Sequence, residues 1–416
     1  MTINKEYIDK LKEKRDKEHM SYRMLSRLIE TETGERIPHS TLNDWLNGGW
    51  EKRKNNESKD KFITDKENLL TKEEIKKWKN LYYSNVKTVA LQDLLTKTLE
   101  NSVKTISPLP LLPVQIGKKY GSLHRAGLLI SDFHYGEVVD YEQTGGLGHY
   151  SPEIASKRLH LLTKKVIELT EIRRNGLSIP DIDIMLMGDI VSGNIHEELA
   201  ETNAVNILDQ TTESAYLLAQ SVGMIAQHFN HVRVFGVPGN HGRMTKKPTF
   251  KDRYVSWDYI CYQLMSLFLK EHKNIEFNLT KSFFQPVEML NTKVLILHGD
   301  GIRGSLGIPF YGIERAVQRL RQILDLKHER FDKIILAHFH DPVDSERYIV
   351  NGAIKSQDEY AITNLFGANN PSQTLFYVNE NHGIVSTEKI YLQDADEDKT
   401  LGLNRGIESV WARNVI

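Results

Sequence analysis

An α/β fold preceded by a small all-α region is the architecture that this sequence predicts. From residue 126 onward, short apolar runs alternate with stretches of helical spacing, which is typical of a buried sheet flanked by helices. Before residue 107 the chain is charged and its apolar residues recur at helical spacing. A length of 416 residues fits two or three domains. We expect a helical region at 1–50, a charged helical connector with a proline-rich linker at 51–122, the α/β domain at 123–393 and a tail at 394–416.

The composition is that of a soluble globular enzyme, with 40% hydrophobic and 26% charged residues. The net charge of −1 shows no bulk imbalance, so a nucleic-acid partner would have to be met by a local patch. The single cysteine, Cys261, excludes an intrachain disulfide and a thiolate metal cluster, and it fits a reducing compartment. The N-terminus lacks an apolar leader and no long apolar run follows, so we expect a cytoplasmic protein without a membrane partner.

Two short helices with a turn between them are predicted near the N-terminus. The first covers 21–30, and its apolar face consists of Met24, Leu25, Leu28 and Ile29. The second covers 38–47, with Pro38 and Ser40 suited to its first turn or cap and a glycine pair at its end. Its apolar face consists of Leu42, Trp45 and Leu46. This arrangement resembles a helix-turn-helix DNA-binding unit, whose second helix enters the major groove.

That resemblance implies a set of DNA-contacting side chains. Base edges would be met by His39, Thr41 and Asn43, and backbone phosphates by Lys52, Arg53 and Lys54. The alternative is an ordinary helical hairpin used for packing, for docking or for forming a homo-oligomer. Both interpretations stay open at this point.

The connector and the linker follow from composition. Residues 50–75 are polar and rich in lysine, which predicts an exposed connection, and residues 72–104 regain helical spacing. The segment Ser107–Pro113 contains three prolines and cannot continue a helix, so we place the linker there.

The α/β domain is predicted from its apolar runs, which we assign to strands. They are Ala126–Ile130, Ile182–Met187, Val232–Val237, Val294–Leu297 and Ile334–Ala337, with further strands at Thr374–Val378 and Gly383–Tyr391. Helices are predicted at Pro152–Arg173 and Thr211–His228. In sheets of this class, ligands bind outside the carboxyl ends of the strands.

Polar side chains gather at the carboxyl end of each of the first five runs. The motifs are Asp132-Phe133-His134, Gly188-Asp189, Gly239-Asn240-His241-Gly242, His298-Gly299-Asp300 and His338-Phe339-His340. Buried carboxylates and imidazoles are costly unless they are paired or bound to metal, so five such sites indicate a metal centre rather than packing. The ligand types suit two ions of Mn²⁺, Fe²⁺ or Zn²⁺ better than Mg²⁺ alone. Two such ions ~3.5–4 Å apart can clamp a phosphoryl group and bind a nucleophilic water.

The order of these five motifs resembles the calcineurin-like metallophosphoesterase superfamily, over about residues 126–345. The resemblance implies a four-layer fold of two mixed β-sheets flanked by helices. It implies that Asp189 bridges two metal ions and that His241 meets the substrate phosphate and protonates the leaving oxygen. The first metal would be held by Asp132, His134 and His340, and the second by Asn240, His298 and His338.

Three further residues are candidates for substrate contact: His196, Arg243 and Arg303. Asp300 is a candidate for orienting a ligand histidine. The Gly-Asp motif continues Ile190-Val191-Ser192-Gly193, without the Asn-Asp pair of phosphoprotein phosphatases, which weakens that assignment.

The resulting hypothesis is a phosphodiesterase or nuclease that acts on DNA with two divalent metal ions, Mn²⁺ foremost. One alternative is a phosphatase or phosphodiesterase acting on nucleotides or phosphoproteins. Another is a DNA-binding protein that uses the same scaffold without catalysis. Partner proteins are not indicated by the sequence.

Overall fold

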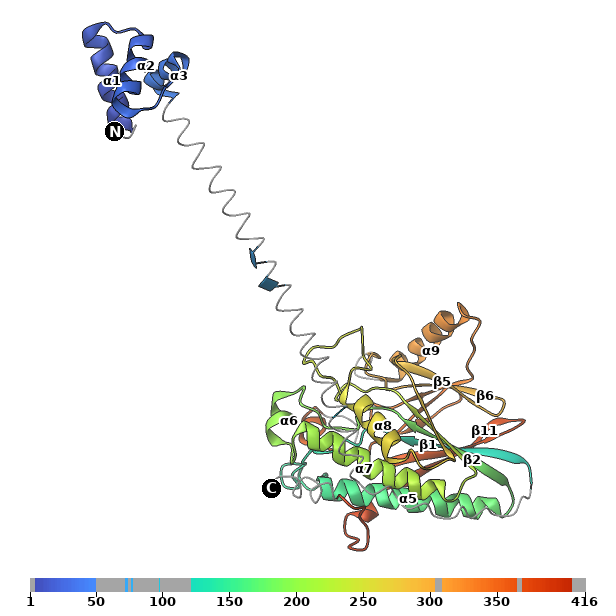
Figure 1. Ribbon diagram of the computed structural model, residues 1–416. Helices are drawn as coiled ribbons and strands as arrows, with labels where there is room; N and C mark the ends of the chain where they lie inside the picture. The colour runs from blue at the N-terminus through green and yellow to red at the C-terminus, as the bar shows by residue number, and fades with distance from the viewer. Residues whose placement is uncertain are drawn as a thin grey trace. The chain divides into compact units, whose positions relative to one another are not determined.

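The computed structural model describes residues 4–49, 72–73, 76–77, 97, 121–303, 309–364 and 369–405. The chain divides into two compact units, Met1–Leu94 and Leu95–Ile416, and each is described by itself (Figure 1). Several predictions fall outside the described residues: the linker Ser107–Pro113, most of the helical stretch 72–104, the three basic residues Lys52, Arg53 and Lys54, and the tail from 406 onward.

The N-terminal unit consists of three helices, α1 (Lys5–Glu18), α2 (Tyr22–Thr33) and α3 (His39–Asp44), followed by a wide helical turn, η1 (Trp45–Gly49). The side chain of Ser21 caps α2 by accepting a hydrogen bond from the amide of Met24, and Gly34 ends this helix with a φ of 79°. The two predicted helices are therefore confirmed, and α1 is an addition. As predicted, Pro38 and Ser40 lie at the start of the second helix: Pro38 occupies the cap position and Ser40 lies in the first turn.

A small apolar core holds the three helices together. It consists of Tyr7, Ile8, Leu11, Leu25, Ile29, Ile37, Leu42 and Leu46. The predicted apolar faces of α2 and α3 both supply buried residues to this core, since Leu25, Ile29 and Leu42 are fully buried. The unit contains two consecutive short helices, as a helix-turn-helix requires. DNA binding by this unit stays a prediction.

The larger unit contains two β-sheets. The first has the strand order β11-β10-β1-β2-β3-β4. Its members are β1 (Leu123–Ile130), β2 (Ser178–Leu186), β3 (His231–Gly236), β4 (Ile275–Leu279), β10 (Ser372–Asn379) and β11 (Gly383–Tyr391). Strands β1 to β4 run parallel, while β10 is antiparallel to both β1 and β11. The sheet is therefore mixed, and the predicted closing strand at 383–391 is confirmed.

The second sheet has the order β5-β6-β7-β9-β8. Its members are β5 (Phe284–Met289), β6 (Thr292–Leu297), β7 (Lys333–Leu336), β8 (Val343–Asp344) and β9 (Tyr348–Val350). Strands β6, β7 and β9 are parallel, and the edge strands β5 and β8 are antiparallel to their neighbours. The motif-bearing strands β6 and β7 thus end on the same edge of this sheet.

Helices cover the outer face of each sheet, which makes four layers (Figure 1). The first sheet packs on α5 (Pro152–Arg174), α7 (Ile207–Ala226) and α8 (Trp257–Phe268), and the second on α9 (Pro309–Asp325). Alternate residues of one strand serve different layers: Leu128 and Ile130 face the helices, whereas Leu129 packs between the sheets. The predicted α/β fold of two mixed sheets flanked by helices is confirmed.

The remaining short elements are α6 (Glu197–Thr202), α10 (Glu359–Thr363) and η2 (Gln393–Ala395). Residues 394–405 are not the loose tail that the sequence predicts. Arg158 on α5 is fully buried and donates to both carboxylate oxygens of Asp396, at 2.8 and 2.6 Å, and Leu401 is buried. The ion pair and the apolar contact attach this segment to the domain.

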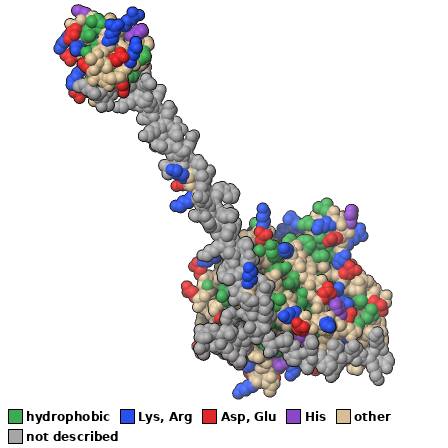
Figure 2. Space-filling view, viewed as in Figure 1, with side chains coloured by type: hydrophobic (Ala, Val, Ile, Leu, Met, Phe, Trp, Pro, Cys, Tyr) green, Lys and Arg blue, Asp and Glu red, His purple; other side chains and the backbone are tan. Residues whose placement is uncertain are grey.

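The surface of each unit mixes basic and acidic side chains in the view of Figure 2, in keeping with the net charge of −1. Within the described ranges, no helix is both long and apolar enough to cross a membrane.

Candidate metal centre

The strand-end motifs come together where the two sheets meet. The amide of Asp132, after β1, donates to the carbonyl of Gly188, after β2, at 3.1 Å. The amide of His134 donates to the carbonyl of Asp189 at 2.9 Å. These backbone bonds continue the parallel pairing of β1 and β2 beyond the strands and place the Asp-x-His and Gly-Asp motifs side by side.

The backbone is strained at the candidate metal ligands. Nine non-glycine residues of the described part have a positive φ, and five of them are candidate ligands. These five are Asp132 (50°), His134 (43°), Asp189 (51°), His338 (72°) and His340 (55°). A residue held in a sparsely populated region costs about 1–3 kcal/mol, and such residues cluster at functional sites. The left-handed backbone at these five residues directs their side chains toward the candidate metal centre, and the strain lowers the stability of the fold.

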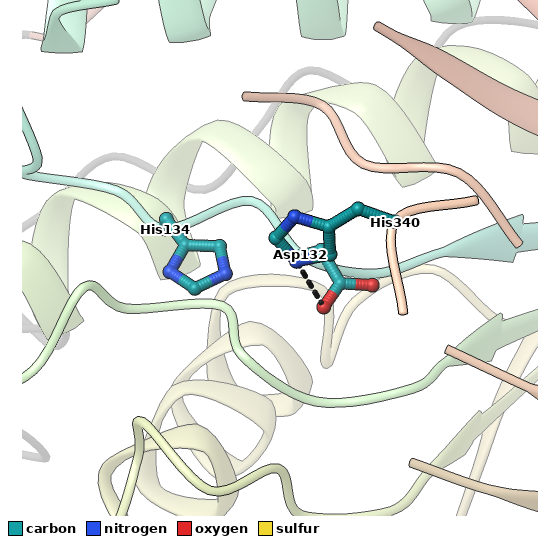
Figure 3. Close-up of side chains that lie close together, drawn as sticks. All are labelled: Asp132, His134 and His340. Atoms are coloured by element: carbon teal, nitrogen blue, oxygen red, sulfur yellow. Dashed lines mark hydrogen bonds and ion pairs between the residues drawn. The ribbon is translucent and has the colours of Figure 1, made fainter. Parts of the chain in front are cut away.

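One cluster is formed by Asp132, His134 and His340 (Figure 3). Their potential ligand atoms all lie within 4.8 Å of one another. Nε2 of His340 lies 3.1 Å from Oδ1 of Asp132. Both ring nitrogens of His134 are buried and have no hydrogen-bond partner among the described residues. A buried imidazole without a hydrogen bond is costly, so His134, whose Nδ1 lies 3.4 Å from Oε2 of Glu137, fits a site that a metal ion completes.

A second cluster is formed by Asp189, His298 and His338, again with ligand atoms within 4.8 Å of one another. Nε2 of His298 lies 3.0 Å from Oδ2 of Asp189 and 3.1 Å from Oδ1 of Asn240. The opposite nitrogen, Nδ1, donates to the carbonyl of Met187 at 2.8 Å. That bond fixes the ring and directs Nε2 toward the cluster, as is usual for a metal-bound histidine.

The donor set fits two divalent ions. Asp132, His134 and His340 could hold one of them, and Asn240, His298 and His338 the other. Asp189 lies between, since its Oδ2 is 3.0 Å from His298 and 4.0 Å from His134. Carboxylate, imidazole and amide donors together suit Mn²⁺, Fe²⁺ or Zn²⁺.

The protonation states of two ligand histidines also fit metal binding, and a third must lose a proton. Burial would lower the pKa of His298, but the Asp189 carboxylate outweighs it and raises the pKa to about 10, so an ion that binds this ring displaces its proton. Burial lowers the pKa of His338 to about 4 and, together with the nearby Lys355 ammonium, lowers that of His134 well below its usual value. Both rings are therefore neutral at pH 7, as ligands must be. Burial alone would raise the pKa of Asp189, but the neighbouring His298 and His241 imidazoles outweigh it and hold the carboxyl well below its usual range.

His241 lies at this centre with its ring held from one side. Its amide donates to Oδ1 of Asp189 at 2.7 Å, and its Nδ1 donates to the carbonyl of Ser192 at 2.8 Å. A carbonyl can only accept, so Nδ1 carries a proton and Nε2 is left for a proton transfer. The His241 ring centroid is 4.5 Å from that of His134.

Two of the three predicted substrate residues are near this ring. His196 precedes α6, and its ring centroid is 5.7 Å from that of His241. Arg243 is half-buried, and its Nε is buried without a hydrogen-bond partner in the described part of the chain. Arg303 is exposed, and no contact between described residues ties its side chain to the cluster.

The structure assigns Asp300 a different partner from the predicted histidine. Nη2 of Arg253 lies 2.7 Å from each of its carboxylate oxygens. The ring of His298, two residues earlier, is oriented by the carbonyl of Met187 instead. Asp300 is thus held by a guanidinium, and its role in orienting a ligand histidine stays a prediction.

Asp258, on α8, supports the centre and was not predicted. Its buried carboxylate accepts hydrogen bonds from the amides of Asp189 (3.1 Å), Ile190 (3.0 Å) and Gly239 (2.9 Å). A Cβ on Gly242 would come within 2.6 Å of its carboxylate carbon, so this approach requires glycine. Burial and the charge of Asp189 raise the pKa of Asp258 to about 6. In the sequence, Asp258 lies in the largely apolar stretch 257–265, and this unusual position could have indicated a buried functional carboxylate.

Replacing Asp258 with asparagine is expected to destabilise the protein by about 1–3 kcal/mol, because the amide NH₂ cannot accept from the backbone N–H groups. The two loops that carry Asp189 and Asn240 would also lose their common support, so Mn²⁺ should bind more weakly. Urea unfolding of the metal-free protein and calorimetric Mn²⁺ titration measure both effects. Asp325→Asn, at an exposed position, is the control. An Asp258→Asn protein within about 0.5 kcal/mol of the wild type would refute this role.

An ion-pair network of Glu137, Lys355 and Asp358 lies beside His134 and was also not predicted. Oε2 of Glu137 lies 3.4 Å from Nδ1 of His134, and Nζ of Lys355 donates to the other carboxylate oxygen at 2.8 Å. Lys355 also pairs with Asp358, which caps α10. Lys355 therefore links the first cluster to the chain segment after β9.

Comparisons with known proteins agree with this geometry at the level of the family. A family profile described as calcineurin-like phosphoesterase matches residues 128–373. Among curated proteins, no match was found.

Similar solved structures include three with low sequence identity. A dimetal phosphatase from Danio rerio is 13% identical, over 64% of this chain and 98% of that one, with a TM-score of 0.33. Purple acid phosphatase PPD1 from yellow lupin is 12% identical, over 66% and 55% of the two chains, with a TM-score of 0.28. Vacuolar protein sorting 29 from Cryptosporidium parvum is 12% identical, over 65% and 99%, with a TM-score of 0.26.

Proposed function

Since this chain belongs to the calcineurin-like phosphoesterase family, we propose that it is a metal-dependent phosphodiesterase that cleaves DNA. One observation carries the hydrolase assignment: the carboxylates and imidazoles of five strand ends, His241 among them, converge into adjoining clusters. When bound, two divalent ions would polarise a phosphoryl group and activate water at neutral pH. We take Mn²⁺ as the ion to test first.

The residues of the chain have separate tasks in this proposal. Asp132, His134, Asp189, Asn240, His298, His338 and His340 hold the ions. In its doubly protonated form, His241 gives the Nε2 proton to the departing oxygen and keeps the Nδ1 proton that bonds to the carbonyl of Ser192. Arg243, whose Nε has no described partner, pairs with a non-bridging phosphate oxygen, and His196 contacts the substrate on the His241 side.

Two features favour DNA as the substrate. The N-terminal unit presents His39 and Asn43 as exposed side chains on its third helix, the one that the helix-turn-helix resemblance would make the recognition helix. Nδ2 of Asn47 donates to Asn43, which orders that surface. The guanidinium of Arg243, next to the metal centre and without a described partner at Nε, provides positive charge for a phosphodiester backbone.

The test is hydrolysis by the purified full chain with Mn²⁺ on four substrates: bis-p-nitrophenyl phosphate, p-nitrophenyl phosphate, and single- and double-stranded DNA. Cleavage of diester and DNA that disappears on metal removal and returns with Mn²⁺ is expected. The same preparation of a His241→Ala variant controls for a contaminating nuclease. Hydrolysis of the monoester alone would change the assignment to a phosphatase. A protein that binds Mn²⁺ and hydrolyses none of the four would favour the non-catalytic alternative.

A further inference from the structure

We propose that residues 244–255, the basic loop, bind a single-stranded nucleic acid next to the metal centre, with Phe250 stacking on an unpaired base. This inference rests on the proposed function and specifies its substrate. The basic loop begins three residues after His241 and ends immediately before Ser256, the cap of α8.

The root of the basic loop is fixed to the metal centre. Arg243 and Ser256 form an antiparallel bridge, and the amide of Trp257 donates to the carbonyl of Gly242 at 2.8 Å. Arg253 is paired with both carboxylate oxygens of Asp300, close in sequence to His298. The loop therefore leaves and re-enters the domain at the centre itself, so a chain bound by it passes the candidate ligands.

The tip of the basic loop carries a local excess of positive charge. Residues 244–255 contain four cations and one anion, a net of 4 − 1 = +3, whereas the whole chain has a net charge of −1. Lys246 pairs with Glu197, but the exposed Lys247 and Lys251 have no ion-pair partner among the described residues. Unpaired lysines next to a phosphoesterase centre fit the phosphates on either side of a scissile bond.

An aromatic side chain stands between these lysines. Phe250 is 97% exposed, more than any other large hydrophobic residue of the described part. A single exposed apolar residue is common on protein surfaces, so it is the position of Phe250, between Lys247 and Lys251 in a loop rooted at the metal centre, that fits a nucleobase. Cations that bind the backbone and an aromatic ring on which a base stacks are the usual elements of a single-strand site.

The same features could meet an anionic membrane. One phenylalanine with a few lysines gives a membrane contact little apolar area, and a membrane gives no account of the root at the metal centre. In a duplex the bases are already stacked, so Phe250 would have no free base face. The observations therefore favour a single-stranded nucleic acid. The experiment below also tests duplex DNA and an anionic membrane.

The experiment compares full-chain variants by kcat/KM on a single-stranded oligonucleotide, relative to kcat/KM on bis-p-nitrophenyl phosphate, which offers one phosphate and no strand. Phe250→Ala is expected to lower this ratio about 10-fold, as for other stacking residues. Lys247→Ala/Lys251→Ala should reduce the slope of log kcat/KM against log salt by about 1.4, at roughly 0.7 per phosphate contact. The controls are Leu326→Ala, whose side chain is 83% exposed, and Lys270→Ala/Lys273→Ala at exposed positions.

The outcomes separate this inference from the proposed function. If the wild type hydrolyses the small diester but Phe250→Ala keeps the wild-type ratio within about two-fold, the inference is wrong and the function stands. If the wild type hydrolyses no diester, the function fails, and fluorescence anisotropy of the Mn²⁺-loaded chain with the oligonucleotide then tests the loop alone. An equal loss on duplex DNA, or a loss of binding to phosphatidylserine vesicles without a loss on the oligonucleotide, would also overturn it.

Discussion

Replacement of His241 with alanine is expected to lower kcat for DNA cleavage by about 10²–10⁴-fold, the range found when a positioned proton donor is removed. Ser192 holds Nδ1 through its carbonyl, so Nε2 is the atom that can protonate the departing oxygen. In the proposed assignment the His241 imidazole is not a metal ligand, although its potential ligand atom lies within 4.8 Å of those of His134 and Asp189. The amide that bonds to Asp189 belongs to the backbone. Mn²⁺ stoichiometry should therefore stay that of the wild type.

The leaving group separates proton donation from a structural role. A p-nitrophenolate leaves readily without a proton, whereas the deoxyribose alkoxide does not, so His241→Ala should impair DNA cleavage far more than hydrolysis of bis-p-nitrophenyl phosphate. Equal losses on both substrates, or loss of bound Mn²⁺, would contradict the proposed role. His231→Ala provides a matched control, since His231 is half-exposed at the start of β3, the end opposite the centre.

Removal of the buried cation at Lys355 is expected to give the largest loss of stability. Lys355→Met keeps the length of the side chain but leaves Glu137 and Asp358 buried without their cation. Breaking a buried ion pair in this way costs about 3–5 kcal/mol. Burial would lower the pKa of Lys355, but the two carboxylates outweigh it and raise the pKa, so the ammonium is charged across the working range. Urea unfolding of the metal-free protein is the measurement, with Lys327→Met at an exposed position as control.

The loss should depend on pH in a defined direction. In the wild type, the pKa of Asp358 is lowered, since Lys355 outweighs burial, so this pair stabilises the fold above the unfolded pKa and the effect is lost as pH falls. Without Lys355, burial raises the folded pKa of the Asp358 carboxyl. The variant should therefore be closest to the wild type at about pH 5 and furthest from it at about pH 8. A larger loss at the lower pH would contradict this account.

The same variant should weaken metal binding. Glu137 contacts Nδ1 of His134, and groups that orient a ligand histidine typically contribute 10–100-fold in metal affinity. A double variant, Glu137→Gln/Lys355→Met, leaves one buried charge fewer and should recover part of the stability but not the affinity. That pattern distinguishes a general loss of folding from a specific loss of orientation.

The layers of the fold could be predicted because buried strands and helices have recognisable patterns of apolar residues in the sequence. Strands such as β1 and β2 are buried on both faces, so they appear as continuous apolar runs, and the polar residue that follows each run marks the edge of the sheet. The candidate ligands were found in the same way. Asp132 and Asp189 each follow such a run, and their chemistry is unusual enough to stand out from packing.

The residues that hold the candidate ligands in place, such as Asp258 and Lys355, could not be predicted from a sequence pattern. Asp258 accepts from backbone amides 68 and 69 positions away, and Lys355 pairs with Glu137 across 218 positions. Neither contact produces a periodic pattern, and an isolated Asp or Lys in a sequence is most often a surface residue. The pairing of Asp300 with Arg253 was missed for the same reason.

The sequence by itself determined the element types, the strand ends and the residue types able to hold metal, because these depend on the period of burial and on side-chain chemistry. Only the tertiary structure decided which groups meet: that His241 is held by Ser192, that Asp258 supports two ligand loops, and that Lys355 neutralises Glu137. The physical reason is that a hydrogen bond or an ion pair requires contact within about 3 Å. Residues far apart in sequence reach that distance only when the two sheets and their helices have packed.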